Sequence, residues 1–224
     1  MLSTSLLAAS SRQRIDPESL NGIAYRQIKA KIIGLDLPPA SIIDESSLAE
    51  ELGIGLTPVR QALRRLAYEN MVIILPRRGT IVADLNLADL HKIFEMRLEL
   101  ETLAVQLAAR RITTEQLKAL DELSAQGVSM SECSDNQLLL QLDHQMHLLL
   151  AQAAHNEFLA ETMEWLYNHV LRLWNVSLHR VTGLAEAMHE HRQIYAAIRD
   201  QQEEVAAALM RTHVQHFQQA FLNL

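Results

Sequence analysis

The sequence has 224 residues, of which 49% are hydrophobic, and its formal net charge is -7. This length allows one large domain or two small ones, and the hydrophobic fraction excludes a disordered chain. A single cysteine, Cys133, excludes an intrachain disulfide and indicates a reducing, cytoplasmic environment. No apolar run approaches the roughly 20 residues of a membrane helix, so we expect no membrane partner.

Charge is unevenly distributed along the chain. Residues 1–84 hold ten Lys/Arg and nine Asp/Glu, whereas the remaining residues hold ten and eighteen, together with all ten histidines. We therefore expect two differently built domains, 19–84 and 85–224. Residues 1–18 contain a short apolar patch with no basic residue before it, and we interpret them as a disordered arm rather than a signal peptide.

The first domain begins with two predicted helices. Isoleucines at near-helical spacing predict a helix over residues 19–34, which ends at Gly34. Two prolines make residues 35–42 a predicted loop. A second helix begins near Asp44–Ser47, where a side-chain oxygen can accept from free backbone N–H groups, and it stops at Gly53.

A third helix is predicted in "TPVRQALRRL", with Thr57 as its cap and Pro58 at its first position. Its buried stripe has helical spacing and consists of Val59, Ala62, Leu63 and Leu66. Arg60 and Arg64 share the opposite side with Thr57, where cations and a hydroxyl suit phosphates and base edges. A solvated basic surface is the alternative interpretation of these arginines.

A basic hairpin follows the third helix. Residues 71–75 are β-branched and aliphatic, the turn "PRRG" carries Arg77 and Arg78, and residues 80–85 return as a second strand. Three helices and a two-stranded hairpin predict a winged helix-turn-helix. Its third helix would enter the major groove, and the wing would contact the DNA backbone or the minor groove.

The second domain is predicted to be entirely helical. The expected helices span about residues 87–111, 113–126, 136–154, 157–179, 184–200 and 202–222, with breaks at 127–134, 156 and 182–183. The fold class is therefore mainly α: a winged helix-turn-helix followed by an all-α bundle of about six helices, large enough to enclose a cavity.

Four polar residues of the bundle are candidate metal ligands. Asp143 and His147 are one helical turn apart, and His191 and His213 fall on apolar stripes of two other helices. One carboxylate and three imidazoles can hold a first-row divalent ion and leave positions open for water or a ligand. The alternative is a set of hydrogen-bonded core residues. Three further histidines are expected to face solvent: His144, His189 and His216.

The first domain resembles the DNA-binding domain of the GntR transcription regulators, through "LAEELG", "TPVRQAL" and "RRGTIV" at the family's spacing. The resemblance implies that Arg60 contacts the operator, with help from Thr57, Arg64, Arg77, Arg78 and Gly79. One departure is Gly55-Leu56, where the family usually has Ser-Arg with a DNA-contacting arginine. Arg65 faces away from Arg60, and we expect it to form a surface salt bridge.

The second domain resembles the FCD ligand-binding domain of the FadR branch of this family, through "RLELETLAVQLAA", "DHQMH", "EHRQIYAAI" and "ALMRTHV". The resemblance implies that Asp143, His147, His191 and His213 bind one metal ion, with zinc or nickel favoured by the imidazoles. It also implies a small organic-acid effector, whose carboxylate Arg97 can bind. A surface ion pair between Arg97 and Glu101 is the alternative.

These expectations combine into one function: a homodimeric, effector-controlled transcription regulator, a repressor, that binds a palindromic DNA operator. The negative net charge does not oppose DNA binding, because the basic surface is local. A helical-bundle metalloenzyme is a rival, but the sequence lacks H-E-x-x-H, P-loop and G-x-S-x-G motifs, so we expect no enzyme activity. A third possibility is a DNA-binding regulator whose helical domain only dimerises.

Overall fold

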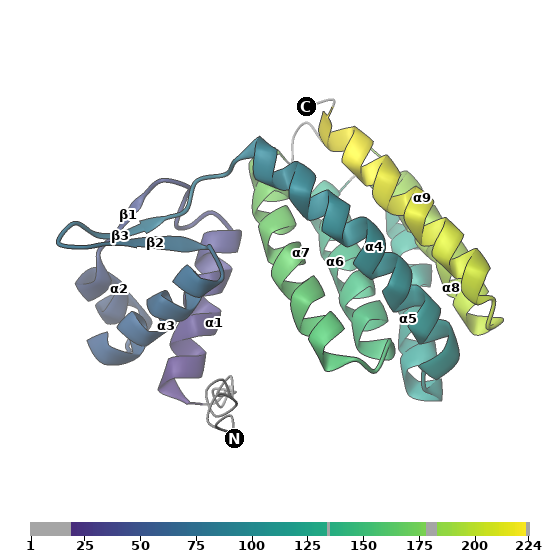
Figure 1. The fold of residues 1–224 in the computed structure, drawn as a ribbon, viewed down its shortest axis with the longest axis horizontal. Helices are drawn as coiled ribbons and strands as arrows, with labels where there is room; N and C mark the ends of the chain where they lie inside the picture. Colours follow the sequence, from purple (N-terminus) through teal and green to yellow (C-terminus); the bar gives the residue numbers. More distant parts are fainter. Residues whose placement is uncertain (1–18, 134, 178–182, 223–224) are drawn as a thin grey trace, which may run out of the picture. The chain divides into compact units, whose positions relative to one another are not determined.

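The computed structural model describes residues 19–133, 135–177 and 183–222. The expected N-terminal arm, residues 1–18, lies outside the described residues. The chain divides into two compact units between Asp84 and Leu85 (Figure 1). The prediction of a mainly α fold with one small sheet is confirmed.

The first unit contains three helices and a three-stranded sheet. Its elements are α1 (Leu20–Ile33), β1 (Ile42–Ile43), α2 (Glu45–Leu52), α3 (Leu56–Tyr68), β2 (Val72–Leu75) and β3 (Gly79–Val82). The strands are antiparallel in the order β1-β3-β2, with Val72 opposite Val82 and Ile42 opposite Ile81. The three helices enclose an apolar core against the sheet.

Local sequence signals explain most of this unit. Asp44 caps α2, because its Oδ1 accepts from the backbone N–H groups of Ser46 and Ser47, both at 2.9 Å. Gly53 ends α2 in the left-handed region at φ 63°, where a side chain would be strained. The predicted stripe of α3 is fully buried and comprises Val59, Ala62, Leu63 and Leu66.

Two details of the first unit differ from the sequence prediction. Helix α3 begins at Leu56 with Gly55 as its N-cap, so Thr57 is not the cap and Pro58 is the third helical residue. Proline is tolerated there because the first four N–H groups of a helix have no intrahelical partner. Strand β1, which has only two residues, was not predicted, and β3 ends at Val82 rather than at residue 85.

The second unit is a bundle of helices, as predicted (Figure 1). Its elements are α4 (Leu87–Arg111), α5 (Thr114–Met130), a short 3₁₀ helix (Ser131–Cys133), α6 (Asn136–Ala153), α7 (Glu157–Ser177), α8 (Leu184–Arg199) and α9 (Glu203–Leu222). Helix α4 packs along α9 and also contacts α6 and α7. No described helix combines the length and apolar character that crossing a bilayer requires.

The expected break after residue 126 is wrong, because α5 continues through Gly127 to Met130. A Cβ at position 127 would lie 2.8 Å from Sδ of Met188, on α8. The glycine therefore allows α5 and α8 to pack closely, which compensates for its poor helix propensity. This packing holds α8 in place, and α8 supplies one of the histidines described below.

Candidate nucleic-acid interface and metal centre

The arginines predicted to contact DNA lie on α3 and on the β2–β3 turn, and all of them are exposed. Thr57, Arg60 and Arg64 are exposed on α3, opposite its buried stripe. The turn exposes Arg77, Arg78 and Gly79, with Gly79 in a left-handed conformation at φ 95°. All six predicted DNA-contacting residues are thus accessible to a ligand.

One carboxylate connects the helix with the wing. Arg60 Nε donates to Glu45 Oε2 at 2.8 Å, and the Thr80 hydroxyl on β3 donates to Glu45 Oε1 at 3.2 Å. Arg65 instead pairs with Glu69 at 3.2 Å, as a salt-bridge partner should, and its guanidinium stacks on the Tyr25 ring. Arg60 is therefore held at the surface in an exchangeable ion pair, whereas Arg65 is a structural residue.

Replacing Glu45 with glutamine should strengthen general DNA binding a few-fold and steepen its salt dependence. The exposed pair with Arg60 is worth at most about 1 kcal/mol, so its loss frees a cation and removes an anion that repels phosphate. Fluorescence anisotropy with a random duplex at several salt concentrations would measure both effects. An unchanged salt slope would mean that Arg60 does not exchange Glu45 for DNA.

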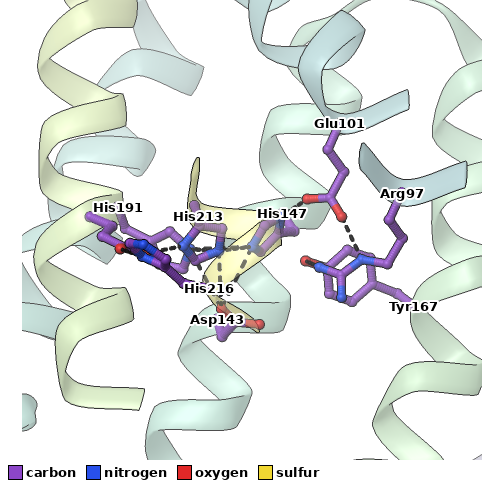
Figure 2. Close-up of polar contacts among 9 residues, drawn as sticks. Arg97, Glu101, Asp143, His147, Tyr167, His191, His213 and His216 are labelled. Carbon is purple, nitrogen blue, oxygen red and sulfur yellow. Dashed lines mark hydrogen bonds and ion pairs between the residues drawn. The ribbon is translucent and has the colours of Figure 1, made fainter. Parts of the chain in front are cut away.

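In the second unit, three helices bring the four predicted metal ligands together (Figure 2). Asp143 and His147 come from α6, His191 from α8 and His213 from α9, and all four are at most 2% exposed. Their ligand atoms lie within 4.8 Å of one another. The Nε2 atoms of the three imidazoles are 3.0 to 3.2 Å apart.

Asp143 lies beside these three nitrogens. Its Oδ1 is 3.5 Å from His191 Nε2, 3.6 Å from His147 Nε2 and 4.0 Å from His213 Nε2. Within the described residues, this buried oxygen has no hydrogen-bond donor. An unpaired buried carboxylate oxygen is costly, and a cation among the four ligand atoms would satisfy it.

The outer nitrogens of two imidazoles contact carboxylates. His147 Nδ1 contacts Glu101 Oε2, and His213 Nδ1 lies 2.8 Å from Glu190 Oε2. A carboxylate only accepts, so Nδ1 carries the hydrogen and Nε2 of a neutral ring presents a lone pair. Lone pairs of buried nitrogens then face each other and Asp143, an arrangement that suits a divalent cation.

The pKa values of the side chains in the cluster are strongly shifted from their usual values. Burial disfavours the charged form of His147, but Glu101 and Asp143 outweigh it and raise its pKa to about 9. Burial, assisted by His213, lowers the pKa of His191 well below its usual value. The pKa of Asp143 is lowered, because the surrounding imidazoles outweigh its burial. A metal-free cluster at neutral pH therefore holds a proton on His147, where a cation would otherwise bind.

Arg97 forms the ion pair with Glu101 that was expected as the alternative, but the pair is buried and does not lie at the surface. Its Nε donates to Glu101 Oε1 at 2.5 Å and its Nη2 to the Tyr167 hydroxyl at 2.7 Å, with both partners also buried (Figure 2). Within the described residues, Arg97 Nη1 has no hydrogen-bond partner. Arg97 thus retains one unused donor beside the carboxylate that contacts His147.

The other histidines follow the prediction only in part. His189 and His216 are exposed as expected, but His144 is half-buried, with its ring 5.6 Å from that of Tyr167. Two carboxylate partners of the imidazoles, Glu101 and Glu190, were not predicted. The nearest signal for Glu101 was its spacing of four residues from Arg97, which was interpreted as a surface pair.

These two units define a class of protein. The first unit has exposed arginines on the third helix and the wing of a winged helix-turn-helix, and a helical domain with a buried Asp/His₃ cluster follows it. This combination is typical of a DNA-binding regulator.

The family comparisons agree with this class. Residues 21–82 match the bacterial regulatory proteins of the gntR family, and residues 92–216 match the FCD domain. The chain belongs to the GntR family of transcription regulators, with a C-terminal FCD domain, consistent with the FadR-like branch. Both matches indicate that the protein is a transcription regulator and not an enzyme, so the metalloenzyme alternative is set aside.

Individual relatives are similar over most of their length. The HTH-type transcriptional regulator YdhC of Bacillus subtilis is 26% identical over 196 residues, 86% of each chain. The Nta operon transcriptional regulator of Aminobacter aminovorans is 29% identical, over 81% of this chain and 85% of its own. The structure of Escherichia coli McbR/YncC has a TM-score of 0.80 at 24% identity, over 92% of this chain and 98% of its own, which shows a shared fold.

Proposed function

We propose that this regulator is a homodimeric repressor whose operator binding responds to a small carboxylate bound near a metal ion. Residues 19–84 would bind a palindromic operator, and residues 85–224 would bind the metal and the effector and form the dimer. The contacting residues would be Thr57, Arg60, Arg64, Arg77, Arg78 and Gly79. The observation that carries the proposal is the convergence of three imidazole Nε2 atoms and Asp143 in a buried, donor-poor site.

The ligand set favours zinc or nickel. Imidazole nitrogens suit both ions, and a single carboxylate adds charge without making the site one for magnesium or calcium. Four protein ligands would hold the ion and leave coordination positions for an exogenous ligand when the ion accepts five or six. A bound metal would supply a fixed positive charge and an exchangeable position for an anion.

Arg97 supports a carboxylate effector. Its Nη1 is buried and has no hydrogen-bond partner among the described residues, while Glu101 and Tyr167 hold the rest of the guanidinium. A ligand carboxylate could accept from Nη1 and bind an open metal position. The effector must bind the DNA-competent and DNA-incompetent arrangements with different affinity, since otherwise it cannot alter operator binding.

The test combines metal analysis with DNA binding. Purified protein should contain about one zinc or nickel ion per chain, and should bind its own upstream DNA with an affinity that falls steeply with salt. Small mono- and dicarboxylic acids should then shift that affinity. Protein that binds the DNA, contains no metal after incubation with zinc or nickel and ignores every acid would leave dimerisation as the role of the helical domain.

Zinc binding should release about one proton per ion at pH 7.5. The pKa of His147 is raised to about 9, so metal-free protein holds this proton at pH 7.5, and zinc must displace it. Apparent zinc affinity should therefore fall about tenfold for each pH unit below 9. Calorimetry in two buffers with different ionisation enthalpies counts the protons. Equal heats in both buffers would contradict the assignment of the proton to the cluster.

A further inference from the structure

We propose that Glu101 and Glu190 are positioning residues, which hold the rings of His147 and His213 so that their Nε2 atoms face the metal. The inference rests on the proposed metal binding and concerns how the site is built around its ligands. Glu190 accepts from Nδ1 of His213 and Glu101 forms an ion pair with Nδ1 of His147, in each case at the ring nitrogen that points away from the cluster, and neither glutamate is a ligand itself.

Glu190 joins α8 to α9. Its Oε2 lies 2.8 Å from His213 Nδ1, and its Oε1 lies 2.5 Å from Nδ1 of His216, one turn further along α9. The Glu190 side chain is 22% exposed and borders a hollow of about 200 Å³. The walls of this hollow are Trp174, Gly183, Glu186, Glu190, His216, Phe217 and Ala220. Glu190 is thus reachable by solvent, while the imidazole that it holds is buried.

Glu101 makes the corresponding contact from α4, without access to solvent. Both of its oxygens are used: Oε1 accepts from Arg97 and Oε2 contacts His147 Nδ1 (Figure 2). The carboxylate therefore lies between the proposed effector-binding cation and one metal ligand. Within the described residues, no carboxylate contacts the outer nitrogen of His191.

The physical reason for these contacts is the tautomer of the ring. A neutral imidazole carries its hydrogen on one nitrogen, and it can bind a metal only through the other. A carboxylate beside Nδ1 fixes the hydrogen there, restrains the ring and increases the basicity of Nε2. Without the carboxylate, the ring can rotate or place its hydrogen on Nε2, where it blocks the metal.

Glu190 offers the cleaner test, because its partial exposure makes truncation tolerable for the fold. We expect Glu190→Ala to weaken zinc binding by about 10- to 100-fold, measured by competition with a chromogenic chelator. The visible absorption of bound Co²⁺ should also change, since His213 is reoriented. Glu190→Gln should retain affinity closer to that of the unmodified protein, because the amide oxygen can still accept from Nδ1–H.

Glu186→Ala is the matched control. Glu186 lies one turn before Glu190 on α8, is exposed and borders the same hollow, so the variant removes the same charge without touching an imidazole. Equal zinc affinities for Glu190→Ala and Glu186→Ala would overturn the proposal. So would equal losses in Glu190→Ala and Glu190→Gln, because these would reflect charge rather than ring orientation.

Glu101→Ala provides a second, buried test with the same expectation of weaker zinc binding and an altered Co²⁺ spectrum. Its circular dichroism spectrum must match that of the unmodified protein, because the substitution also removes the partner of buried Arg97. Failure of the proposed metal binding would give a different result, because the unmodified protein would then bind neither zinc nor Co²⁺. Unmodified protein that binds both ions, with glutamate variants that bind them equally tightly, would refute the positioning role alone.

Discussion

Replacing Arg60 with alanine should weaken binding to the upstream DNA by about 1–3 kcal/mol, or roughly 5- to 150-fold. Arg60 lies in the N-terminal half of α3, is exposed and forms an exchangeable pair with Glu45. A guanidinium at this position can donate twice to a guanine edge or bind phosphate. Anisotropy titrations with the upstream duplex at several salt concentrations separate these contacts, because loss of a phosphate contact lowers the salt slope by about one.

Arg199→Ala is the charge-matched control for this experiment. Arg199 lies in the second unit, where it pairs with its neighbour Asp200 at 2.7 Å. The control variant should bind the duplex as the unmodified protein does. If Arg60→Ala did so as well, α3 would not be the helix that contacts the bases, and the proposed DNA surface would be wrong.

The departure at Gly55-Leu56 has a structural explanation. Leu56 is the first residue of α3 and packs, half-buried, against the hydrophobic core of the first unit. An arginine at this position would extend toward solvent or DNA, whereas leucine contributes burial instead. In the proposed DNA complex, base contacts would therefore come from residues further along α3, Thr57, Arg60 and Arg64, and we expect the operator to differ from those of relatives with the arginine.

Periodicity and capping predicted the fold well, because they are local properties of the chain. The stripe of α3 and the Asp44 cap each depend on a few neighbouring residues, and the structure has both. The start of α3 was misplaced because Thr-Pro is a strong signal for a helix start, yet Gly55 occupies the cap. Strand β1 was missed because its two residues are specified by pairing with β3, which no local pattern records.

The residues of the candidate site likewise fall into a predicted group and a group that the sequence did not indicate. Helical spacing placed His191 and His213 on inward stripes, and the resemblance to FCD domains joined them to Asp143 and His147. Glu101 and Glu190 could not be predicted, because each contacts an imidazole on another helix. Spacing within one helix is informative about that helix alone, so residues that support a ligand from a neighbouring helix emerge only from packing.

His191→Ala should remove metal binding and leave operator binding intact. Loss of a supporting residue outside the ligand set costs about 10- to 100-fold in metal affinity, so loss of a ligand should exceed roughly 100-fold. His191 is the most informative ligand to truncate, because no described carboxylate contacts its outer nitrogen and none is left unpaired. The first unit, with its own core, should still fold and bind DNA.

Two measurements check this expectation, with His189→Ala as the control, because His189 is exposed on the same helix. Zinc at 100 times its Kd should stabilise the unmodified protein and the control by about 2.7 kcal/mol, seen as a rise in Tm, but should not stabilise His191→Ala. Carboxylic acids that release the unmodified protein from DNA should have no effect on His191→Ala. A variant that kept its zinc-dependent Tm shift would show that the ion binds elsewhere, and the imidazole cluster would then be a polar core without a metal.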